Sequence, residues 1–153
     1  LSMVSRPPCA ETILRAIASP RPAPPARRTA IGPIPGSQER AVVVGGRDRR
    51  VRALRAADGK ELWSFAYDAP GSFNHPGSRS APIVDGNHVY TCGVLGDLYC
   101  INTGTHKAVW NKNIWKDFGG GRIPMWAITQ CPLVYGDLLI VASQAPQAGA
   151  IVD

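Results

Sequence analysis

The sequence repeats itself at an interval of about 50 residues, and this repeat constrains the fold more than any other feature. Residues 42–63 align without a gap onto residues 89–110, so each position of the first segment has its equivalent 47 positions later. A third copy starts at residue 131, where residues 131–136 repeat residues 81–86 after 50 positions. The aligned pairs include Val42 with Val89, Gly46 with Gly93, Val51 with Leu98, Lys60 with Lys107 and Trp63 with Trp110. A short repeat of this kind cannot bury its apolar faces alone, so successive copies must stack on one another.

Short apolar runs bounded by turn residues indicate strands rather than helices. Tight turns are predicted at Asp58-Gly59, Asp85-Gly86 and Gly136-Asp137, since glycine adopts a positive φ at little steric cost. No segment after Arg40 has a sustained helical period. The strands are predicted at residues 41–45, 49–54, 61–67, 81–84, 88–92, 97–101, 108–113, 130–134, 138–142 and 149–152. The fold class is therefore all-β, built from antiparallel meanders.

Four-stranded antiparallel sheets that recur at this interval are typical of the blades of a β-propeller. Residues 41–153 hold two to two and a half such blades, whereas propellers close with about four to eight. We therefore expect the chain to be a fragment of a β-propeller, with residues 41–153 as its incomplete set of repeats.

Residues 1–40 differ in composition from the repeats. They hold eight of the fourteen prolines. Proline has a fixed φ and no amide donor, so we predict a disordered or extended lead-in that joins no sheet. Residues 1–55 carry eleven arginines against three acidic residues. Because these arginines are scattered among proline and alanine without an aromatic platform, they do not predict nucleic-acid binding.

Four cysteines, Cys9, Cys92, Cys100 and Cys131, show no spacing typical of a disulfide framework. We expect Cys92 and Cys100 to lie on two strands joined by a turn at residues 94–97, with Cys92 opposite Tyr99. Alternation along a strand then places the two thiols on opposite faces of the sheet, so a disulfide between them is not expected. We predict that both are buried free thiols.

The segments VRALRAADGKELW and LYCINTGTHKAVW, which end at the two matched tryptophans, resemble the repeat of the pyrroloquinoline-quinone-type (PQQ-like) β-propeller family. The resemblance implies that Trp63 and Trp110 dock each blade against its neighbour. Gly59 lies in the turn that permits this approach, and Gly46 and Gly93 occupy the matched glycine position. These five residues are the predicted blade-docking residues. The chain departs from the pattern at Arg55, where Asp or Asn is usual, and at His106, which replaces the turn glycine.

The resemblance implies two main functions. The first is a non-catalytic β-propeller module that binds or scaffolds a protein or ligand; bacterial outer-membrane assembly lipoproteins carry the same kind of repeat. The alternative is a fragment of a PQQ-dependent quinoprotein oxidoreductase that acts on alcohols or sugars. A repeat domain attached to a signalling enzyme is a third and weaker hypothesis.

No catalytic, cofactor-binding or metal-binding residue can be assigned from the sequence. The chain has no adjacent pair of cysteines, and its carboxylates occur singly, mostly in turns, where they cap backbone amides. The glycine-rich run at residues 118–122 lacks the Gly-Lys-Ser/Thr ending of a phosphate-binding loop. Three histidines, His75, His88 and His106, lack metal-ligand spacing. We therefore expect a protein that is not an enzyme and has no cofactor, with PQQ and calcium only under the alternative.

Two longer loops, residues 68–80 and 115–129, occupy equivalent places in consecutive repeats. Matched loops on one rim of a repeat structure usually form its binding face, and aromatic residues and arginine are favoured at interfaces. The candidate binding residues at the rim are Phe73, Asn74, His75, Arg122, Met125 and Trp126. The alternative for Trp126 is that it packs its own loop down.

The expected partner is a protein, or the missing blades of the same propeller, rather than nucleic acid. No stretch approaches the roughly 18 apolar residues of a membrane-spanning helix, and no signal peptide is visible. The family resemblance implies a periplasmic or exported location.

Overall fold

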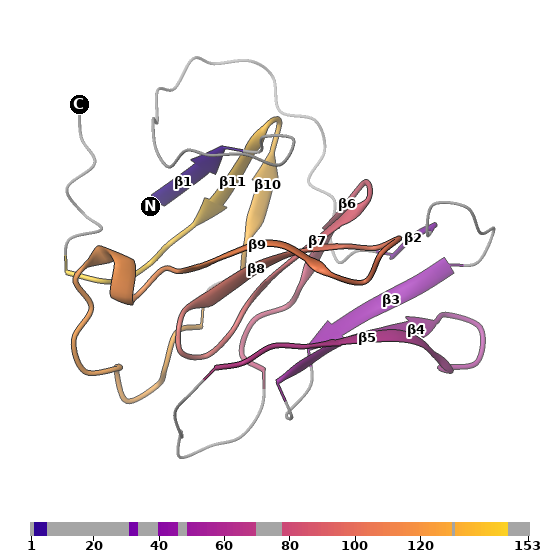
Figure 1. Ribbon diagram of the computed structural model, residues 1–153, viewed down its shortest axis with the longest axis horizontal. Coiled ribbons are helices and arrows are strands. Elements are labelled where there is room, and N and C mark those ends of the chain that lie inside the picture. The colour runs from indigo at the N-terminus through magenta and orange to yellow at the C-terminus, as the bar shows by residue number, and fades with distance from the viewer. Residues whose placement is uncertain are drawn as a thin grey trace.

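Where the structure describes the chain, its strands form three antiparallel sheets that stack on one another (Figure 1). The computed structural model describes residues 2–5, 31–33, 40–45, 49–69, 78–129 and 131–146, with only the backbone of the first two segments. This part of the chain contains no α-helix, and its one helical element is the 3-10 turn η1 (Lys116–Phe118). It therefore holds no helix long and apolar enough to cross a membrane. The predicted all-β class is confirmed.

The three sheets follow the order of the repeats. The first sheet has the order β2 (Ile31–Pro33), β3 (Arg40–Gly45), β4 (Arg50–Arg55) and β5 (Glu61–Ala66). The middle sheet has the order β6 (Ile83–Asp85), β7 (His88–Cys92), β8 (Asp97–Asn102) and β9 (Ala108–Asn113). The third sheet has the order β10 (Leu133–Tyr135), β11 (Leu138–Val141) and β1 (Ser2–Ser5). The last predicted strand, residues 149–152, lies outside the described residues.

The repeat seen in the sequence is also a repeat of strand register. Val42 pairs with Leu54 in the first sheet, and Val89 pairs with Ile101, 47 positions later, in the middle sheet. A β-bulge interrupts the pairing of β4 with β5 and recurs at the equivalent place between β8 and β9. The third sheet repeats the middle one after 50 residues, since β10 pairs with β11 in the register of β6 with β7. The predicted blades are therefore structural repeats.

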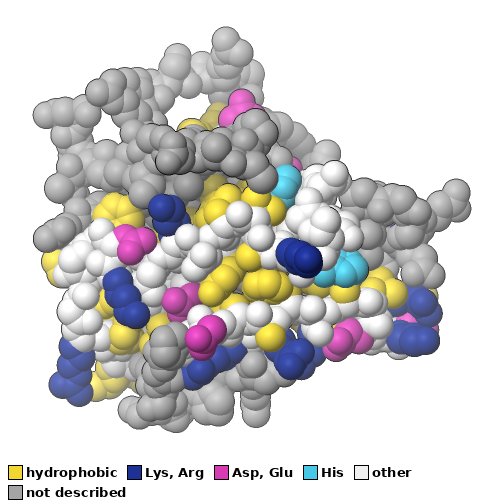
Figure 2. All heavy atoms as spheres, in the orientation of Figure 1, with side chains coloured by type: hydrophobic (Ala, Val, Ile, Leu, Met, Phe, Trp, Pro, Cys, Tyr) yellow, Lys and Arg dark blue, Asp and Glu magenta, His cyan; other side chains and the backbone are white. Residues whose placement is uncertain are grey.

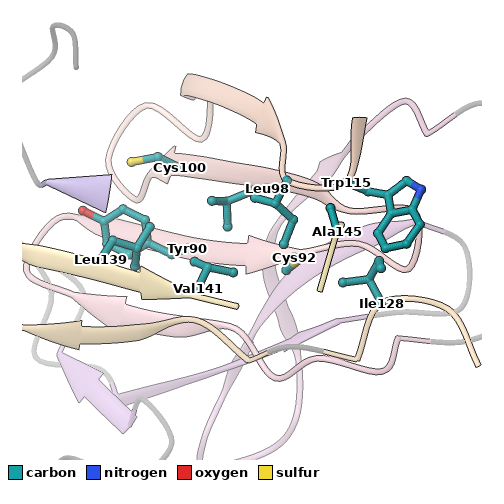
Figure 3. Packing of buried hydrophobic residues seen from close by; sticks show 10 residues of the cluster. Tyr90, Cys92, Leu98, Cys100, Trp115, Ile128, Leu139, Val141 and Ala145 are labelled. Carbon is teal, nitrogen blue, oxygen red and sulfur yellow. The ribbon is translucent and has the colours of Figure 1, made fainter. Parts of the chain in front are cut away.

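The middle sheet buries an apolar cluster on each of its faces, because successive side chains of a strand point in opposite directions. On one face, Val89 and Ile101 pack with Val51, Ala53 and Trp63 of the first sheet. The cluster on the other face contains Tyr90, Cys92, Leu98, Cys100, Ile114, Trp115, Ile128, Leu139, Val141 and Ala145 (Figure 3). Leu139 and Val141 of β11 belong to this second cluster, so the cluster joins the middle sheet to the third sheet.

The predicted arrangement of the two cysteines of the middle sheet is wrong. Cys92 pairs with Leu98 and not with Tyr99, and Cys92 and Cys100 both belong to the cluster that faces the third sheet. The register differs by one residue because the hairpin closes over three residues, and Gly96 supplies the positive φ of 87° that such a loop favours. Both cysteines are buried, and neither forms a disulfide with a residue that the structure describes.

Two short strands lie within residues 1–40, where the sequence predicts a lead-in that joins no sheet. β1 pairs with β11, and β2 pairs with β3, so for these two segments that expectation is wrong. The reason is local composition: β1 precedes every proline of the chain, and the proline of β2 lies at the end of an edge strand, where its missing amide is tolerated. Residues 6–30 and 34–39 lie outside the described residues, and for them the lead-in stays a prediction.

The turn between β8 and β9 keeps the geometry of a glycine turn without the glycine. Gly59 takes a φ of 74°, and His106, its equivalent, takes a φ of 57°. Both amides donate to the carbonyl four residues earlier over 2.8 Å. The His106 ring stacks on Trp63 of the first sheet, with ring centroids 5.2 Å apart and planes at 19°. The stack offsets the backbone strain of a non-glycine residue at positive φ.

His106→Ala is expected to destabilise the fold by about 1–2 kcal/mol, because alanine keeps the strained φ and loses the ring stack. His106→Gly removes the strain together with the stack, so its free energy of unfolding should stay within about 1 kcal/mol of wild type. Urea unfolding followed by circular dichroism measures both values. Equal destabilisation by the two substitutions would show that strain and stacking do not offset each other.

Candidate binding loop at the rim of the sheets

The two matched tryptophans both lie between sheets, but they differ in burial. Trp63 is only 7% exposed and belongs to the cluster between the first and middle sheets. Trp110 is partly buried, packs against the cluster that faces the third sheet, and has its ring 6.1 Å from that of Tyr90. These contacts support the prediction that Trp63 and Trp110 dock neighbouring sheets against each other. Substitution of each tryptophan tests that prediction.

Gly93 allows the first sheet to approach the middle sheet closely. A β-carbon at Gly93 would lie 3.2 Å from the ring of Tyr67, which is tighter than ordinary contact. Glycine is favoured at position 59 for a different reason. Nothing lies within 4 Å of its β-carbon position, so only the positive φ of the turn favours glycine there. Gly46, the predicted equivalent of Gly93, lies outside the described residues.

The rim loop, which we define as residues 115–129, is fixed at its start by the last residue of β9. Asn113 Nδ2 donates to Asp97 Oδ1 over 2.8 Å. Asn113 Oδ1 accepts from the amides of Trp115 and Lys116 at 3.1 and 2.8 Å. One amide side chain therefore joins the β7–β8 hairpin to the first turn of the rim loop.

Trp115 holds the rim loop from the inside (Figure 3). It is 6% exposed, and its Nε1 donates to the Gly121 carbonyl over 2.9 Å. The chain wraps closely around this indole, because a β-carbon at Gly120 would come within 2.5 Å of ring atoms. The amides of Gly119 and Gly120 donate to carbonyls of the same turn. The glycine-rich run thus encloses an indole.

The far end of the rim loop is anchored by Ile128. Its side chain is fully buried, and its amide donates to the Val94 carbonyl over 3.0 Å, on the turn between β7 and β8. Just before it, Ala127 takes a φ of 61° and donates its amide to the Pro124 carbonyl over 2.9 Å. A tight turn at residues 124–127 therefore projects from a buried base.

Met125 and Trp126 form the exposed tip of this turn. Their exposed fractions are 74% and 63%. Arg122, on the same loop, is also exposed. Trp126 does not pack its own loop down; Trp115 does. The three candidate residues of the rim loop are thus accessible together, and they keep their status as predicted binding residues.

Asn113, Trp115 and Ile128 hold the loop, and sequence reasoning did not single them out. A signal for Trp115 was present, because an indole followed closely by three glycines indicates backbone packed against an aromatic ring. No local signal identifies Ile128, since its partner lies on a different hairpin.

The other long loop is described only at its ends. Its three candidate residues, Phe73, Asn74 and His75, lie outside the described residues, so their place at the rim stays a prediction. The start of the loop is attached to the middle sheet, because the Tyr99 hydroxyl donates to the Asp68 carbonyl over 3.3 Å.

The groups beneath the rim loop are poorly suited to nucleophilic chemistry. Burial raises the pKa of Cys92 to about 12, so its thiol stays protonated near neutral pH. Burial also raises the pKa of Asp97, and the hydrogen bond from Asn113 opposes this shift. Within the described ranges, no group of three or more His, Cys, Asp or Glu side chains is placed to hold a metal ion. The expected lack of a cofactor and the quinoprotein alternative both stay predictions.

Basic and acidic side chains are interspersed on the face shown in Figure 2. On the first sheet, Arg52 pairs with Glu61 and Arg55 pairs with Asp58, each at 3.1 Å. The second pair gives a reason for Arg55 at a position where the family usually has Asp or Asn. Asp58 contacts Arg55 through one carboxylate oxygen, and its other oxygen, Oδ1, accepts the Lys60 amide over 3.1 Å within the same turn. Protein binding rather than nucleic-acid binding remains our expectation.

Residues 23–152 match the family described as "Outer membrane protein assembly factor BamB". The chain belongs to the BamB family. The PQQ-like repeat predicted from the sequence is thereby confirmed. The family match begins at residue 23, upstream of residue 41, where the repeats were predicted to start.

The crystal structure of BamB from Moraxella catarrhalis is similar to this chain, with a TM-score of 0.53 and 23% sequence identity. The similarity covers 67% of this chain and 31% of that chain, so this chain spans 31% of the length of its solved relative. At this identity the likeness shows the fold, and the predicted propeller fragment is confirmed. A search of curated proteins finds no match.

Proposed function

We propose that this chain is a non-catalytic β-propeller module that binds a protein partner through the rim loop. The observation that carries the proposal is the exposure of Met125 and Trp126 on a loop with a buried, hydrogen-bonded base. Burying large apolar side chains favours association, and a preorganised loop loses little conformational entropy when it binds. Arg122 on the same loop adds hydrogen-bond donors for the rim of the interface.

The BamB family supplies the setting of this proposal. BamB is named as an assembly factor for outer membrane proteins. We infer that the partner of this chain is a protein that takes part in outer membrane assembly, and that the chain acts in the periplasm or another exported location. Tryptophan and arginine, the residue types most enriched at energetic centres of interfaces, both occur on the rim loop.

The double variant Trp126→Ala/Arg122→Ala should weaken partner binding by about 30-fold or more, since removal of a central anchor typically costs about 2 kcal/mol. Envelope extract of the native organism is passed over immobilised wild-type and variant chains to find a protein that only wild type retains. Calorimetry with that purified protein then gives the two dissociation constants.

Lys112→Ala is the matched control, because Lys112 is an exposed residue of β9 outside the rim loop. It should bind like wild type. Circular dichroism establishes that all variants are folded. A purified partner that binds the double variant as tightly as wild type would remove the rim loop from the binding site.

A further inference from the structure

Two cysteines from consecutive repeats lie on either side of the junction between the middle and third sheets. Cys92 is the last residue of β7 and belongs to the cluster that joins these two sheets. Cys131 lies two residues before β10, the first strand of the third sheet. In the sequence repeat, Cys131 is the equivalent, 50 positions later, of Ala81 in the middle sheet.

A hydrogen bond brings Cys131 to the end of β7. The Ala81 amide donates to Cys131 Sγ over 3.4 Å. In the pairing of β6 with β7, Ile83 lies opposite Tyr90. The same register, continued for two residues, places Ala81 opposite Cys92, and opposite residues of an antiparallel pair have Cα atoms about 4.5–5.5 Å apart. The sulfur of Cys131 thus contacts the residue beside Cys92, and it comes from the sheet toward which the Cys92 side chain points.

The electrostatics of Cys92 agree with this placement. Burial and the charge of Asp97 raise the pKa of Cys92, and the charge of an ionised Cys131 raises it further. Such an effect requires that the two sulfurs lie close together, since charges interact weakly beyond about 10 Å.

The two cysteines differ in accessibility. Cys92 is 2% exposed, whereas Cys131 is exposed. The exposure of Cys131 does not depend on its place in the last sheet of the stack. Its equivalent, Ala81, is also exposed, although the middle sheet has a neighbouring sheet on each face. Cys131 is therefore the sulfur that an oxidant in solution can reach.

Cys100, on the same face of the middle sheet, is placed differently. It pairs with Tyr90, so it lies diagonally across the β7–β8 pair from Cys92, and Figure 3 shows the two side chains apart. Diagonal neighbours are about 7–8 Å apart, whereas the two β-carbons of a disulfide lie within about 4.5 Å. Cys100 is thus an internal control, a buried cysteine that does not reach Cys92.

We propose that Cys92 and Cys131 form a disulfide that joins the middle sheet to the third sheet when the chain meets a thiol oxidant. The oxidant is itself a disulfide, either a small molecule or a thiol oxidoreductase. Cys131 attacks it as the thiolate, which forms a mixed disulfide and releases one thiol. Cys92 then loses its proton and attacks the Cys131 sulfur, and the second thiol leaves. The two cysteines lose two electrons and two protons in total, and the oxidant is reduced to two thiols. The burial of Cys92 makes the second step the slow one.

The bond closes a loop of about 40 residues, which contains β8, β9 and the whole rim loop. A link of this kind stabilises the folded chain mainly because it restricts the unfolded one. It also fixes the end of the rim loop, since Ile128 lies three residues before Cys131. The proposal does not depend on whether the rim loop binds a partner.

Incubation of the full chain with reduced and oxidised glutathione tests the proposal, because the mixture lets wrong bonds reshuffle. Remaining thiols are blocked with iodoacetamide after denaturation, and peptides from a digest without reduction are analysed by mass spectrometry. We expect a pair of peptides linked through Cys92 and Cys131, both in wild type and in Cys100→Ala. In Cys131→Ser, the Cys92 thiol should be recovered blocked by iodoacetamide.

Urea unfolding measures the effect on stability. For a loop of this length, the unfolding equilibrium constant of oxidised wild type should be lower than that of reduced wild type by about a hundredfold or more. Cys131→Ser is the matched control, because the residue is exposed and serine keeps an acceptor for the Ala81 amide. It should unfold like reduced wild type in both oxidising and reducing buffer.

Three results would overturn the proposal. In the first, both thiols stay reduced or Cys131 carries only glutathione. In the second, Cys92 is linked to Cys9 or Cys100 instead. In the third, the Cys92–Cys131 link forms but the oxidised chain unfolds more readily than the reduced one, because the two sulfurs would then not be placed for bonding.

Discussion

Replacing Trp63 by alanine is expected to destabilise the chain by about 3–5 kcal/mol, the usual range for truncation of a buried aromatic side chain. The indole is 7% exposed, lies in the cluster between the first and middle sheets, and stacks on His106. Its removal opens a cavity at the junction of two sheets. Because domains of this size are stable by only about 5–15 kcal/mol, urea unfolding followed by circular dichroism should show a large drop in the midpoint.

Two other tryptophans serve as controls for this result. Trp126→Ala removes the same atoms from a side chain that is 63% exposed, so the free energy of unfolding should change by less than about 0.5 kcal/mol. Trp110 is partly buried and should give an intermediate value. Similar losses at Trp63 and Trp126 would contradict the role of Trp63 between the sheets.

Much of the fold is predictable from the interval between the two matched tryptophans. When a sequence repeats without a gap, strand pairs, bulges and turns recur at the same offset, because each is set by its place within the repeat. The left-handed turn persists even at His106, where the local preference for glycine is lost. There, contact with Trp63 of the neighbouring sheet stabilises a conformation that the residue alone disfavours.

The candidate site is less predictable, because long-range contacts decide it. Trp115 and Trp126 lie on the same loop and look alike as sequence, yet one is buried and the other exposed. The difference depends on the attachment of Ile128 to Val94, 34 residues away, which no local pattern reveals. Likewise, the pairing of β1 with β11 joins opposite ends of the chain. The predicted strand partner of Cys92 was wrong for a smaller reason, because the loop between β7 and β8 is one residue shorter than predicted.

Gly120→Ala is expected to destabilise the chain by about 3 kcal/mol, at the upper end of the usual range for overpacking. The new β-carbon would come within 2.5 Å of ring atoms of Trp115. That ring cannot move away without loss, since it is buried and its Nε1 donates to the Gly121 carbonyl. Urea unfolding measures the change. Gly121→Ala is the matched control, because nothing lies within 4 Å of its β-carbon position, and it should unfold like wild type.

The same pair of variants tests whether the tip of the rim loop is held rigidly. Hydrogen exchange of the Trp115 indole N–H and the Ile128 amide, followed by NMR, should be faster in Gly120→Ala and unchanged in Gly121→Ala. Gly120→Ala should also weaken partner binding without touching the partner, because the turn that presents Met125 and Trp126 loses its preorganisation. If Gly120→Ala keeps both the stability and the slow exchange of wild type, the glycines do not hold the indole. The rigid base on which the proposed binding depends would then be absent.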